Sequence, residues 1–326
     1  MLKVAANYDE TVGANDVVQS ENALKIVPPT RSFGAALLSA TRPRQWVKNL
    51  LVFVAPAAAG ALGHAGSVLR AAAAGLIFIL ASSGTYLIND ASDIVSDRAH
   101  PIKRFRPIAA GEVTVRAAWI LGITFIGASV VCAALLAGRD LALLIASYVI
   151  LTTAYSTWLK RVPFLELAIV ASGFVLRAVA GGIAVHVTIS PWFLLVTSTC
   201  ALLIVIGKRT AELMLLREQS QLHRSVIAFY TENSLTVLRI AVSLVALVGY
   251  GLWAFSQAAR FDALHASGDN LFFKLSIVPF VACLVVLEIA LRRGEGGEPE
   301  ELALNNHLLQ LLGVCCVGLV VAGIYL

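Results

Sequence analysis

An acidic cluster follows directly on one of the long apolar runs of the chain. Residues 89–97 read NDASDIVSD, which places one amide and three carboxylates at the edge of a run of bilayer length. If the run is an α-helix that continues to the last aspartate, a turn of about 100° per residue brings Asn89, Asp90, Asp93 and Asp97 into one quadrant. Hard oxygen ligands on one face suit Mg²⁺, which is usually bound together with substrate phosphates. The spacing predicts a magnesium site, with a solvated helix end as the alternative.

Basic side chains follow these acids within a few residues. Lys103, Arg104 and Arg106 lie in the sequence AHPIKRFRPIAAG, so one loop combines a metal-type acidic face with groups that bind phosphate. This pairing suits a diphosphate, because metal and basic side chains share its negative charge. A basic loop alone is also typical of the cytoplasmic side of a membrane protein, so loop topology is the alternative for these three residues.

The elements that must position these groups are membrane spans. Of the 326 residues, 58% are hydrophobic and 14% are charged, with a mean hydropathy of +0.81, whereas about a quarter of the residues of a soluble domain are charged. Apolar blocks long enough to cross a bilayer recur along the chain, and such spans are helical because the backbone must satisfy its own hydrogen bonds in lipid. We therefore expect an all-α integral membrane protein with nine transmembrane helices. The expected spans lie near residues 46–63, 67–89, 115–136, 140–158, 163–184, 190–207, 235–257, 271–291 and 307–326.

The basic residues predict the orientation of these spans. Lys and Arg cluster before the first span and after the second, fourth, sixth and eighth, which places the N-terminus in the cytoplasm and the C-terminus outside. The net charge of +5 arises in these loops and not in a long basic tract, which argues against nucleic acid as a partner. Residues 1–40 are interpreted as a flexible cytoplasmic tail without signal-peptide features, and residues 41–326 as one transmembrane catalytic domain.

Further candidate residues lie inside or at the ends of the expected spans. Arg177 falls about 20 Å along its helix from Phe164, at 1.5 Å per residue, and a charge at that depth should face a cavity or an acidic partner. Lys48 is an interfacial anchor or a substrate ligand. Tyr155 and Lys160 end the fourth span, where a lysine that snorkels to the interface is the alternative to a substrate ligand.

The acidic motif resembles the first aspartate-rich motif of the UbiA superfamily of intramembrane prenyltransferases, and a longer set of sequences resembles one branch of it, the decaprenyl-phosphate phosphoribosyltransferases. The resemblance runs from about residue 40 to the C-terminus. It is carried by RPRQWVKN at 42–49, NDASDIVSDRAHPIKRFRPIAAG at 89–111, YSTWLK at 155–160, LRAVAGG at 176–182, GKRTAEL at 207–213 and GEPEELAL at 297–304. It implies a UbiA-like helical bundle with nine spans, an active-site cavity that faces the cytoplasm, and a Mg²⁺-bound diphosphate.

The branch implies a reaction. Its members transfer 5-phosphoribose from phosphoribosyl diphosphate to a polyprenyl (decaprenyl) phosphate and release diphosphate, in the plasma membrane, for the arabinose donor of cell-wall assembly. A homo-oligomer is a further expectation from the resemblance. Typical prenyltransferases carry a second aspartate-rich motif where this chain has GKRTAE at 207–212. Two bases and one acid suit two anionic substrates, although Lys208 and Glu212 also have the spacing of a helical ion pair.

The charges and the resemblance together predict the site. The expected metal ligands are Asn89, Asp90, Asp93 and Asp97. The expected catalytic residues are Asp90, Asp93, Asp97 and Lys103. The expected substrate-binding residues are Lys48, Asn89, Lys103, Arg104, Arg106, Tyr155, Lys160, Arg177, Lys208, Arg209 and Glu212. A general base is not required, because the attacking lipid phosphate is already an anion.

Two other functions are consistent with parts of the sequence. A prenyltransferase that moves a polyprenyl group from its diphosphate to an aromatic acceptor would share the first motif, but it would need carboxylates where GKRTAE stands. A transporter of an anionic metabolite could use the acids for a coupling cation near the midplane. The two halves of the sequence show no clear inverted repeat, and the acids lie at one end of a span.

Overall fold

The computed structural model describes residues 31–218, 226–265, 271–297 and 299–325, and every element in these ranges is a helix. The first half contains α2 (Phe33–Ala40), η1 (Pro43–Phe53), α3 (Val54–Ala58), η2 (Ala61–Gly63), α4 (Ala65–Ser92), α5 (Ile94–Ala99), η3 (Lys103–Phe105), α6 (Val115–Thr157) and η4 (Leu159–Arg161). The second half contains α7 (Leu165–Val185), α8 (Pro191–Glu218), η5 (Val226–Phe229), α9 (Glu232–His265), α10 (Leu271–Leu275), α11 (Ile277–Arg292), η6 (Glu295–Gly297), α12 (Pro299–Asn305) and α13 (His307–Tyr325). The prediction of an all-α protein is confirmed for the described part of the chain.

Seven helical stretches in the described residues are long and apolar enough to cross a membrane. They are Ala65–Ser92, Val115–Thr157, Leu165–Val185, Pro191–Leu215, Glu232–Ala263, Leu271–Arg292 and His307–Tyr325. The expected number of nine is not confirmed. Helix α6 contains two expected spans, joined at a kink where Gly138 has φ +71°, a value that glycine adopts without steric cost. The first expected span is divided into η1, α3 and η2, with Pro56 and Gly60 within it.

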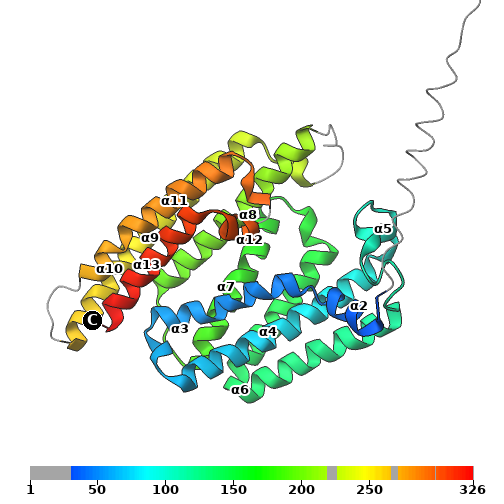
Figure 1. Cartoon of the computed structure of the whole chain (residues 1–326), viewed down its shortest axis with the longest axis horizontal. Helices are drawn as coiled ribbons and strands as arrows, with labels where there is room; N and C mark the ends of the chain where they lie inside the picture. Colours follow the sequence, from blue (N-terminus) through cyan, green and yellow to red (C-terminus); the bar gives the residue numbers. More distant parts are fainter. Residues whose placement is uncertain (1–30, 219–225, 266–270, 298, 326) are drawn as a thin grey trace, which may run out of the picture.

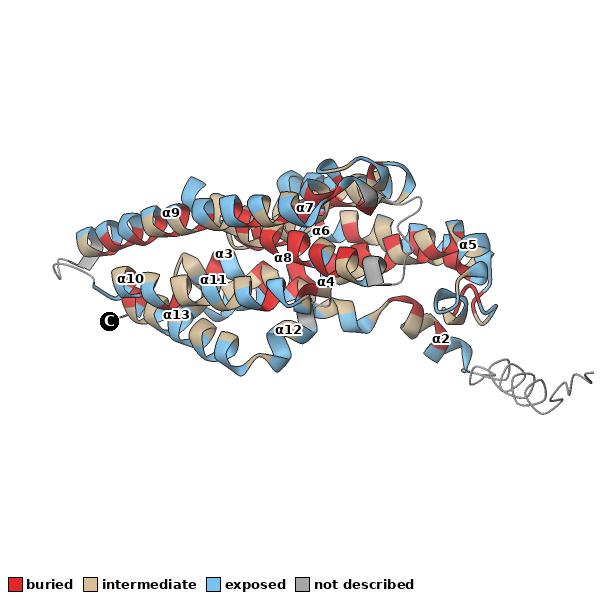
Figure 2. Cartoon of the chain, turned by 90° about the horizontal axis from the view of Figure 1, so that it is seen from above, coloured by how far each residue is buried: buried red, intermediate tan, exposed pale blue. Residues whose placement is uncertain are grey.

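The helices pack in two groups that α7 connects (Figure 1). Helix α4 packs mainly on α6, and α8 packs mainly on α9, while α7 contacts both α6 and α8. Buried residues concentrate on the central helices α4, α7 and α8 (Figure 2). Gly181 allows the backbone of η1 to touch α7, because a Cβ there would lie 1.6 Å from the carbonyl oxygen of Val52. The glycines at the end of LRAVAGG therefore hold the first segment against α7.

The predicted N-terminal tail is described only at its end. Residues 1–30 lie outside the described residues, so their flexibility remains a prediction. Residues 33–40 form α2, whose first turn is capped by the Ser32 side chain accepting from the N–H of Ala35. Ala36 and Ala40 are buried in one cluster with Leu87 of α4. This part of the expected tail is thus packed on the helix that carries the acidic motif.

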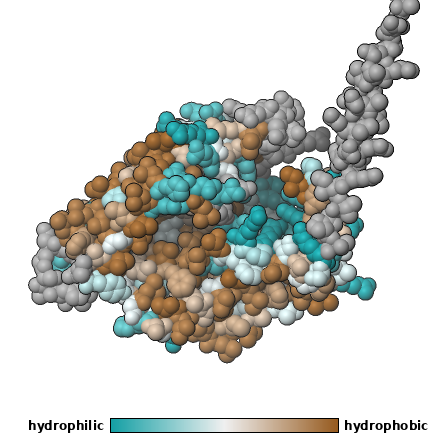
Figure 3. All heavy atoms as spheres, viewed as in Figure 1, coloured by the Kyte–Doolittle hydropathy of each residue, from teal (hydrophilic) through white to brown (hydrophobic). Residues whose placement is uncertain are grey.

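Polar and apolar side chains separate along the molecule. Hydrophilic residues gather around the end of the bundle where α5 and α12 lie, whereas most of the remaining visible surface is hydrophobic (Figure 3). Large apolar side chains are exposed on the outer faces of the long helices, among them Leu76, Ile120, Leu135 and Val314. An apolar surface of this extent marks contact with a membrane or a partner, and the lengths of the helices indicate a membrane.

Candidate active site

The acidic motif lies at a break between two helices. Helix α4 ends at Ser92, and Asp93, with φ −90° and ψ 10°, separates it from α5. The expectation of one continuous helix through Asp97 is therefore wrong. Ser and Asp compete with the helical backbone for its hydrogen bonds and favour helix ends, which accounts for the break at this pair. The amide of Asp97 still donates to the carbonyl oxygen of Asp93 at 2.9 Å, so α5 follows directly on α4.

Two of the predicted metal ligands converge on one arginine. Nη1 of Arg106 lies 3.2 Å from Oδ1 of Asp90 and 2.8 Å from Oδ2 of Asp97. Nη2 of Arg42 lies 2.6 Å from the same oxygen of Asp90, and its guanidinium stands 4.5 Å above the ring of Tyr86. Asp90 and Asp97 are only 3% and 2% exposed, and buried carboxylates require such partners. Arg106 therefore contacts the acids themselves, and Arg42 is a site residue that the sequence reasoning did not single out.

The other two predicted ligands make no such contacts. The side chains of Asn89 and Asp93 are half-buried and form no hydrogen bond within the described part of the chain. In that part, no three His, Cys, Asp or Glu side chains stand close enough to hold a metal ion by themselves. Mg²⁺ commonly takes one or two carboxylates and completes its octahedron with water and substrate phosphates. The oxygen donors present here fit that mode of binding, and not a cage made by protein alone.

The basic loop turns two of its three predicted phosphate ligands toward solvent. Lys103 and Arg104 lie on η3 and are exposed, and the guanidinium of Arg104 stands 4.8 Å from the ring centre of Phe105. The loop is shaped by Nδ1 of His100, which accepts from the amides of Ile102 and Lys103 at 3.1 and 3.3 Å. Because α5 packs on η3, these two cations stand beside the acidic motif and are accessible to a soluble anion.

A second polar cluster is centred on Arg209. Its Nε donates to Oε1 of Glu166 at 2.6 Å, its Nη2 donates to the other oxygen of Glu166, and its Nη1 donates to Glu212. Tyr155 lies close to Arg209 and to both acids. Three predicted residues, Tyr155, Arg209 and Glu212, are therefore brought together. Lys208 is exposed outside the cluster, so the expected pair of Lys208 with Glu212 is replaced by the pair of Arg209 with Glu212.

Glu166 is the residue of this cluster that sequence reasoning missed. It is 0% exposed, and its one visible signal is that it is an acid inside an apolar block. Tyr230 donates to Oε1 of Glu166 at 3.2 Å and accepts from the amide of Phe164 at 2.8 Å. Burial raises the pKa of Tyr230, which keeps its hydroxyl protonated as a donor. This contact also holds Phe164 at φ +62°, a conformation that is costly for a bulky residue.

Arg177 lies in the core and not on an open surface. It is 6% exposed. Its Nε donates to Oδ1 of Asn49 at 2.8 Å, its Nη1 to the carbonyl of Gly173 at 2.6 Å, and its Nη2 to the hydroxyl of Tyr148 at 3.0 Å. The guanidinium also stands over the rings of Phe78 and Tyr148. The expected acidic partner is absent from these contacts. Nε and Nη2 connect α7 with η1 and α6, and Nη1 bonds within α7 itself.

Replacing Arg177 by methionine should destabilise the protein. The change removes three hydrogen bonds and leaves buried groups of Asn49 and Tyr148 without a partner, which costs about 1–3 kcal/mol for each group. We expect a lower thermal midpoint in detergent, with Arg177→Lys in between because lysine cannot form the same three-way fork. Unchanged midpoints for both variants would show that these contacts contribute no net stability.

A large apolar groove runs between the first segment of the chain and the helices of the second half. It has a volume of about 650 Å³ and is lined by η1, α3, α7, α8, α9, α12 and α13. Of its lining residues only Lys48 is charged, and its Nζ stands 5.8 Å from the ring centre of Phe174. Ala303 and Leu304 of α12 also line the groove. The predicted substrate residue Lys48 therefore lies in the wall of the apolar groove, six residues after Arg42. Lys160, on η4, is half-buried and does not line the groove.

Comparisons with known proteins agree with the sequence motifs. The model of the UbiA prenyltransferase family matches residues 50–309. A decaprenyl-phosphate phosphoribosyltransferase of Mycolicibacterium smegmatis is 39% identical over 311 residues, which cover 94% of this chain and 98% of that protein. A decaprenyl-phosphate phosphoribosyltransferase of Corynebacterium glutamicum is 35% identical over 301 residues, which cover 91% of this chain and 89% of that protein.

A solved structure shows the same fold. It is a UbiA homologue from Archaeoglobus fulgidus bound to GPP and Mg²⁺, with a TM-score of 0.64 and 18% sequence identity. The alignment covers 89% of this chain and 100% of that chain. At this identity the comparison supports the arrangement of helices and carries no residue roles.

Proposed function

The chain belongs to the UbiA prenyltransferase family of integral membrane proteins, and from this we propose that it transfers 5-phosphoribose from phosphoribosyl diphosphate to a polyprenyl phosphate. The products are the lipid-linked phosphoribose and diphosphate. Near full-length similarity to decaprenyl-phosphate phosphoribosyltransferases is the observation that carries this proposal. Decaprenyl phosphate is the acceptor that the names of these relatives indicate, and a role in cell-wall biosynthesis follows from it.

The soluble donor binds at the acidic motif. Asp90 and Asp93, supported by Asn89 and Asp97, would hold Mg²⁺, which supplies positive charge to the diphosphate when bound. Lys103, Arg104 and Arg106 bind the same diphosphate and stabilise the charge that grows as it leaves. Arg106 forms ion pairs with Asp90 and Asp97, so the two acids hold its guanidinium in position to bind the donor.

The chemistry is a substitution at the anomeric carbon. The bond from that carbon to the diphosphate oxygen breaks, with the electron pair leaving on diphosphate. A phosphate oxygen of the lipid forms the new bond from the opposite face. The lipid phosphate is ionised near neutral pH, so no side chain has to remove a proton. The donor diphosphate and the lipid phosphate are both anionic. Basic side chains are therefore needed at 207–212, where a prenyltransferase carries its second aspartate-rich motif.

The lipid acceptor lies along the apolar groove. Lys48 binds its phosphate at the polar end, and the first part of the polyprenyl chain occupies the 650 Å³ cavity. The Arg209 cluster, with Tyr155 and Glu212, shapes the region between the two substrates. Lys160 and Lys208 would add positive charge for the lipid phosphate, while Arg177 positions η1 through Asn49.

The orientation of the membrane protein follows from its donor. A phosphorylated sugar is a cytoplasmic metabolite, so the acidic motif and the basic loops face the cytoplasm. We place the chain in the plasma membrane with the N-terminus inside and the C-terminus outside. Nine crossings result if the two arms of α6 and the segment 43–63 each cross the bilayer. A homo-oligomer remains a prediction from the family.

Binding of polyprenyl phosphate in the groove can be measured by alkylation of the cysteines that line it. Cys200 and Cys316 line the groove, whereas Cys132 is exposed on α6. Polyprenyl phosphate should slow alkylation of Cys200 by an apolar maleimide several-fold and leave Cys132 unchanged, as read by peptide mass spectrometry. Equal rates at Cys200 with and without the lipid would place the polyprenyl chain elsewhere.

Donor selectivity tests the function against its rivals. The purified enzyme should label polyprenyl phosphate from phosphoribosyl diphosphate and should not transfer a prenyl group from a prenyl diphosphate to an aromatic acid. The reverse selectivity would favour an ordinary prenyltransferase. Accumulation of unchanged donor inside sealed vesicles would favour a transporter.

A further inference from the structure

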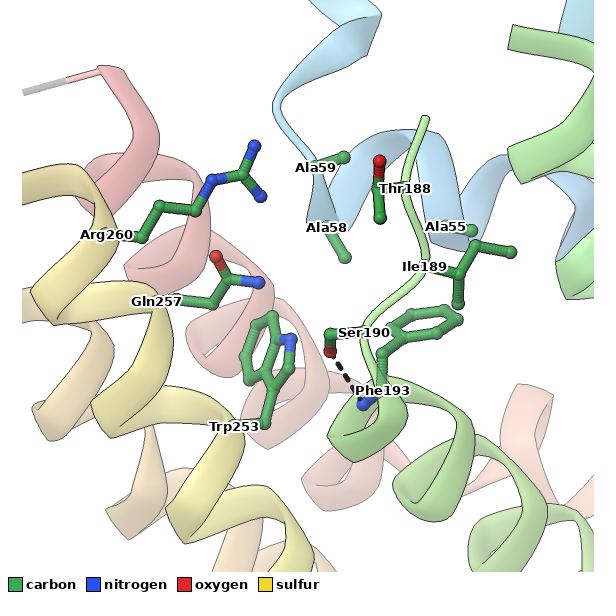
Figure 4. A pocket seen from close by; sticks show the side chains of 10 residues that line it. All are labelled: Ala55, Ala58, Ala59, Thr188, Ile189, Ser190, Phe193, Trp253, Gln257 and Arg260. Carbon is green, nitrogen blue, oxygen red and sulfur yellow. Dashed lines mark hydrogen bonds between the residues drawn. The ribbon is translucent and has the colours of Figure 1, made fainter. Parts of the chain in front are cut away.

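A small polar hollow lies at the end of the bundle opposite the acidic motif. It is formed by the end of α3, the connection between α7 and α8, and one face of α9 (Figure 4). The 28-residue α4 begins near this end, beside η2, and reaches the acidic motif about 40 Å away at 1.5 Å per residue. The hollow is therefore far from the acidic motif where the donor is proposed to bind.

Two buried polar atoms in the hollow have no partner. Trp253 and Gln257 are 5% and 6% exposed, yet Nε1 of Trp253 and Oε1 of Gln257 form no hydrogen bond. Both side chains project from α9 toward the segment that contains Thr188 (Figure 4). Buried polar groups are almost always hydrogen-bonded, so these two atoms call for an occupant. The indole requires an acceptor, and the amide oxygen requires a donor.

The charge of the hollow favours an anionic occupant. Arg260 lies one helical turn beyond Gln257 and projects to the same side (Figure 4), and none of the lining residues is acidic. The N-terminus of the long helix α8 also lies at the hollow, where the Ser190 hydroxyl accepts from the amide of Phe193 at 3.1 Å. The positive end of a helix dipole adds to the attraction for an anion. An arginine, an indole N–H and a helix N-terminus together suit phosphate oxygens.

The size of the hollow limits what enters it. Its volume is about 30 Å³, and a water-sized group needs roughly 10–15 Å³ of such space. It admits about two oxygen-sized groups and excludes a sugar diphosphate. Phe193 and Trp253 also line the large apolar groove, so apolar surface continues directly from the hollow. A headgroup can insert one edge here while its chains lie in the surrounding membrane.

We propose that this hollow binds the headgroup of a membrane phospholipid that carries both a phosphate and hydroxyl groups, as phosphatidylglycerol does. The phosphate accepts from Nε1 of Trp253 and from Arg260, and a headgroup hydroxyl donates to Oε1 of Gln257. The headgroup thus supplies the acceptor that Nε1 of Trp253 lacks and the donor that Oε1 of Gln257 lacks. This binding does not depend on the reaction at the other end of the bundle.

The test compares lipids and variants in the full-length protein. Delipidated protein in detergent is titrated with phosphatidylglycerol, phosphatidylcholine or inorganic phosphate, and binding is followed by native mass spectrometry and by the thermal midpoint. Phosphatidylglycerol should bind about tenfold more tightly than phosphatidylcholine, the difference expected from one charge-assisted or buried hydrogen bond. Gln257→Leu should lose most of this preference, Arg260→Gln should weaken the binding of both lipids several-fold, and both variants should retain transfer activity.

Arg139→Gln is the matched control, because Arg139 is an exposed arginine at the kink of α6 and does not line the hollow. This variant should keep the preference of the original protein. Equal binding of the two lipids, a preference that survives Gln257→Leu, or an unchanged affinity in Arg260→Gln would mean that the hollow holds only ordered water. Stabilisation by inorganic phosphate equal to that by phosphatidylglycerol would identify a free anion and overturn the lipid assignment.

Discussion

Asp93→Asn should lower phosphoribosyl transfer by about 10²–10³-fold, the loss typical for one electrostatic contact to the reacting group, with little change in thermal stability. Asp93 is half-buried at the break between α4 and α5 and has no side-chain partner in the described structure. Asparagine keeps its size and its fitness for a helix end, but it removes the negative charge that would hold Mg²⁺. The activity loss should be accompanied by a higher Mg²⁺ requirement, measured by titration of the metal at fixed donor concentration.

Asp140→Asn is the control for this change, since Asp140 is an exposed acid on α6 beside the kink. It should leave both activity and metal requirement unchanged. Asp90→Asn should instead reduce stability as well as activity, because Asp90 is buried between Arg42 and Arg106. If Asp93→Asn kept full activity with an unaltered Mg²⁺ titration, the assignment of the metal to this motif would be wrong.

Arg209→Met should cost about 3–5 kcal/mol of stability, the cost of leaving one member of a buried ion pair without its partner. Glu166 is completely buried, and Arg209 donates to both of its oxygens. The loss should appear as a lower thermal midpoint and as reduced yield of folded protein. Lys208→Met is the matched control, because Lys208 is adjacent in sequence but exposed, and its stability should stay within experimental error.

A double variant separates packing from function at this cluster. Arg209→Met combined with Glu166→Leu replaces the pair by apolar groups, and such replacements are often neutral or stabilising. We expect the double variant to regain stability while transfer stays low, because the cluster positions the substrates. Recovery of both stability and activity would reduce the cluster to a structural element, and recovery of neither would indicate a folding role beyond the pair.

Features that depend on a local pattern of residues, such as the helices and the acidic motif, could be predicted from the sequence. Block length and hydrophobicity predicted helices in nearly every span. Of the acids in NDASDIVSD, the fold brings Asp90 and Asp97 together on Arg106, and the metal site remains a prediction. The helix break at Asp93 was not predicted, because the acids were placed on a helix that continues the preceding span. The kink at Gly138 falls between the expected spans 115–136 and 140–158, where the structure has one bent helix in place of two. The hydrophobic pattern does not reveal where one residue takes a non-helical conformation.

Contacts between residues far apart in the chain could not be predicted from the sequence. Arg42 reaches Asp90 across 48 positions, and Arg209 reaches Glu166 across 43. Each pair is a consequence of how the helices pack, which Gly181 and its close contact with η1 help to fix. Arg177 was recognised as unusual from its depth, but its partners proved to be an amide, a carbonyl and a phenol. A single sequence contains no signal that selects these over an acid.

Transfer of phosphoribose to a membrane lipid can be measured directly. Purified protein would be given Mg²⁺, polyprenyl phosphate and phosphoribosyl diphosphate labelled in the ribose, and label would be followed into the organic-solvent phase with and without a chelator. We expect metal-dependent label in the lipid, which requires polyprenyl phosphate and is lost in Asp93→Asn. Absence of lipid label with several polyprenyl lengths, beside a phosphoribosyltransferase that works under the same conditions, would contradict the proposed function.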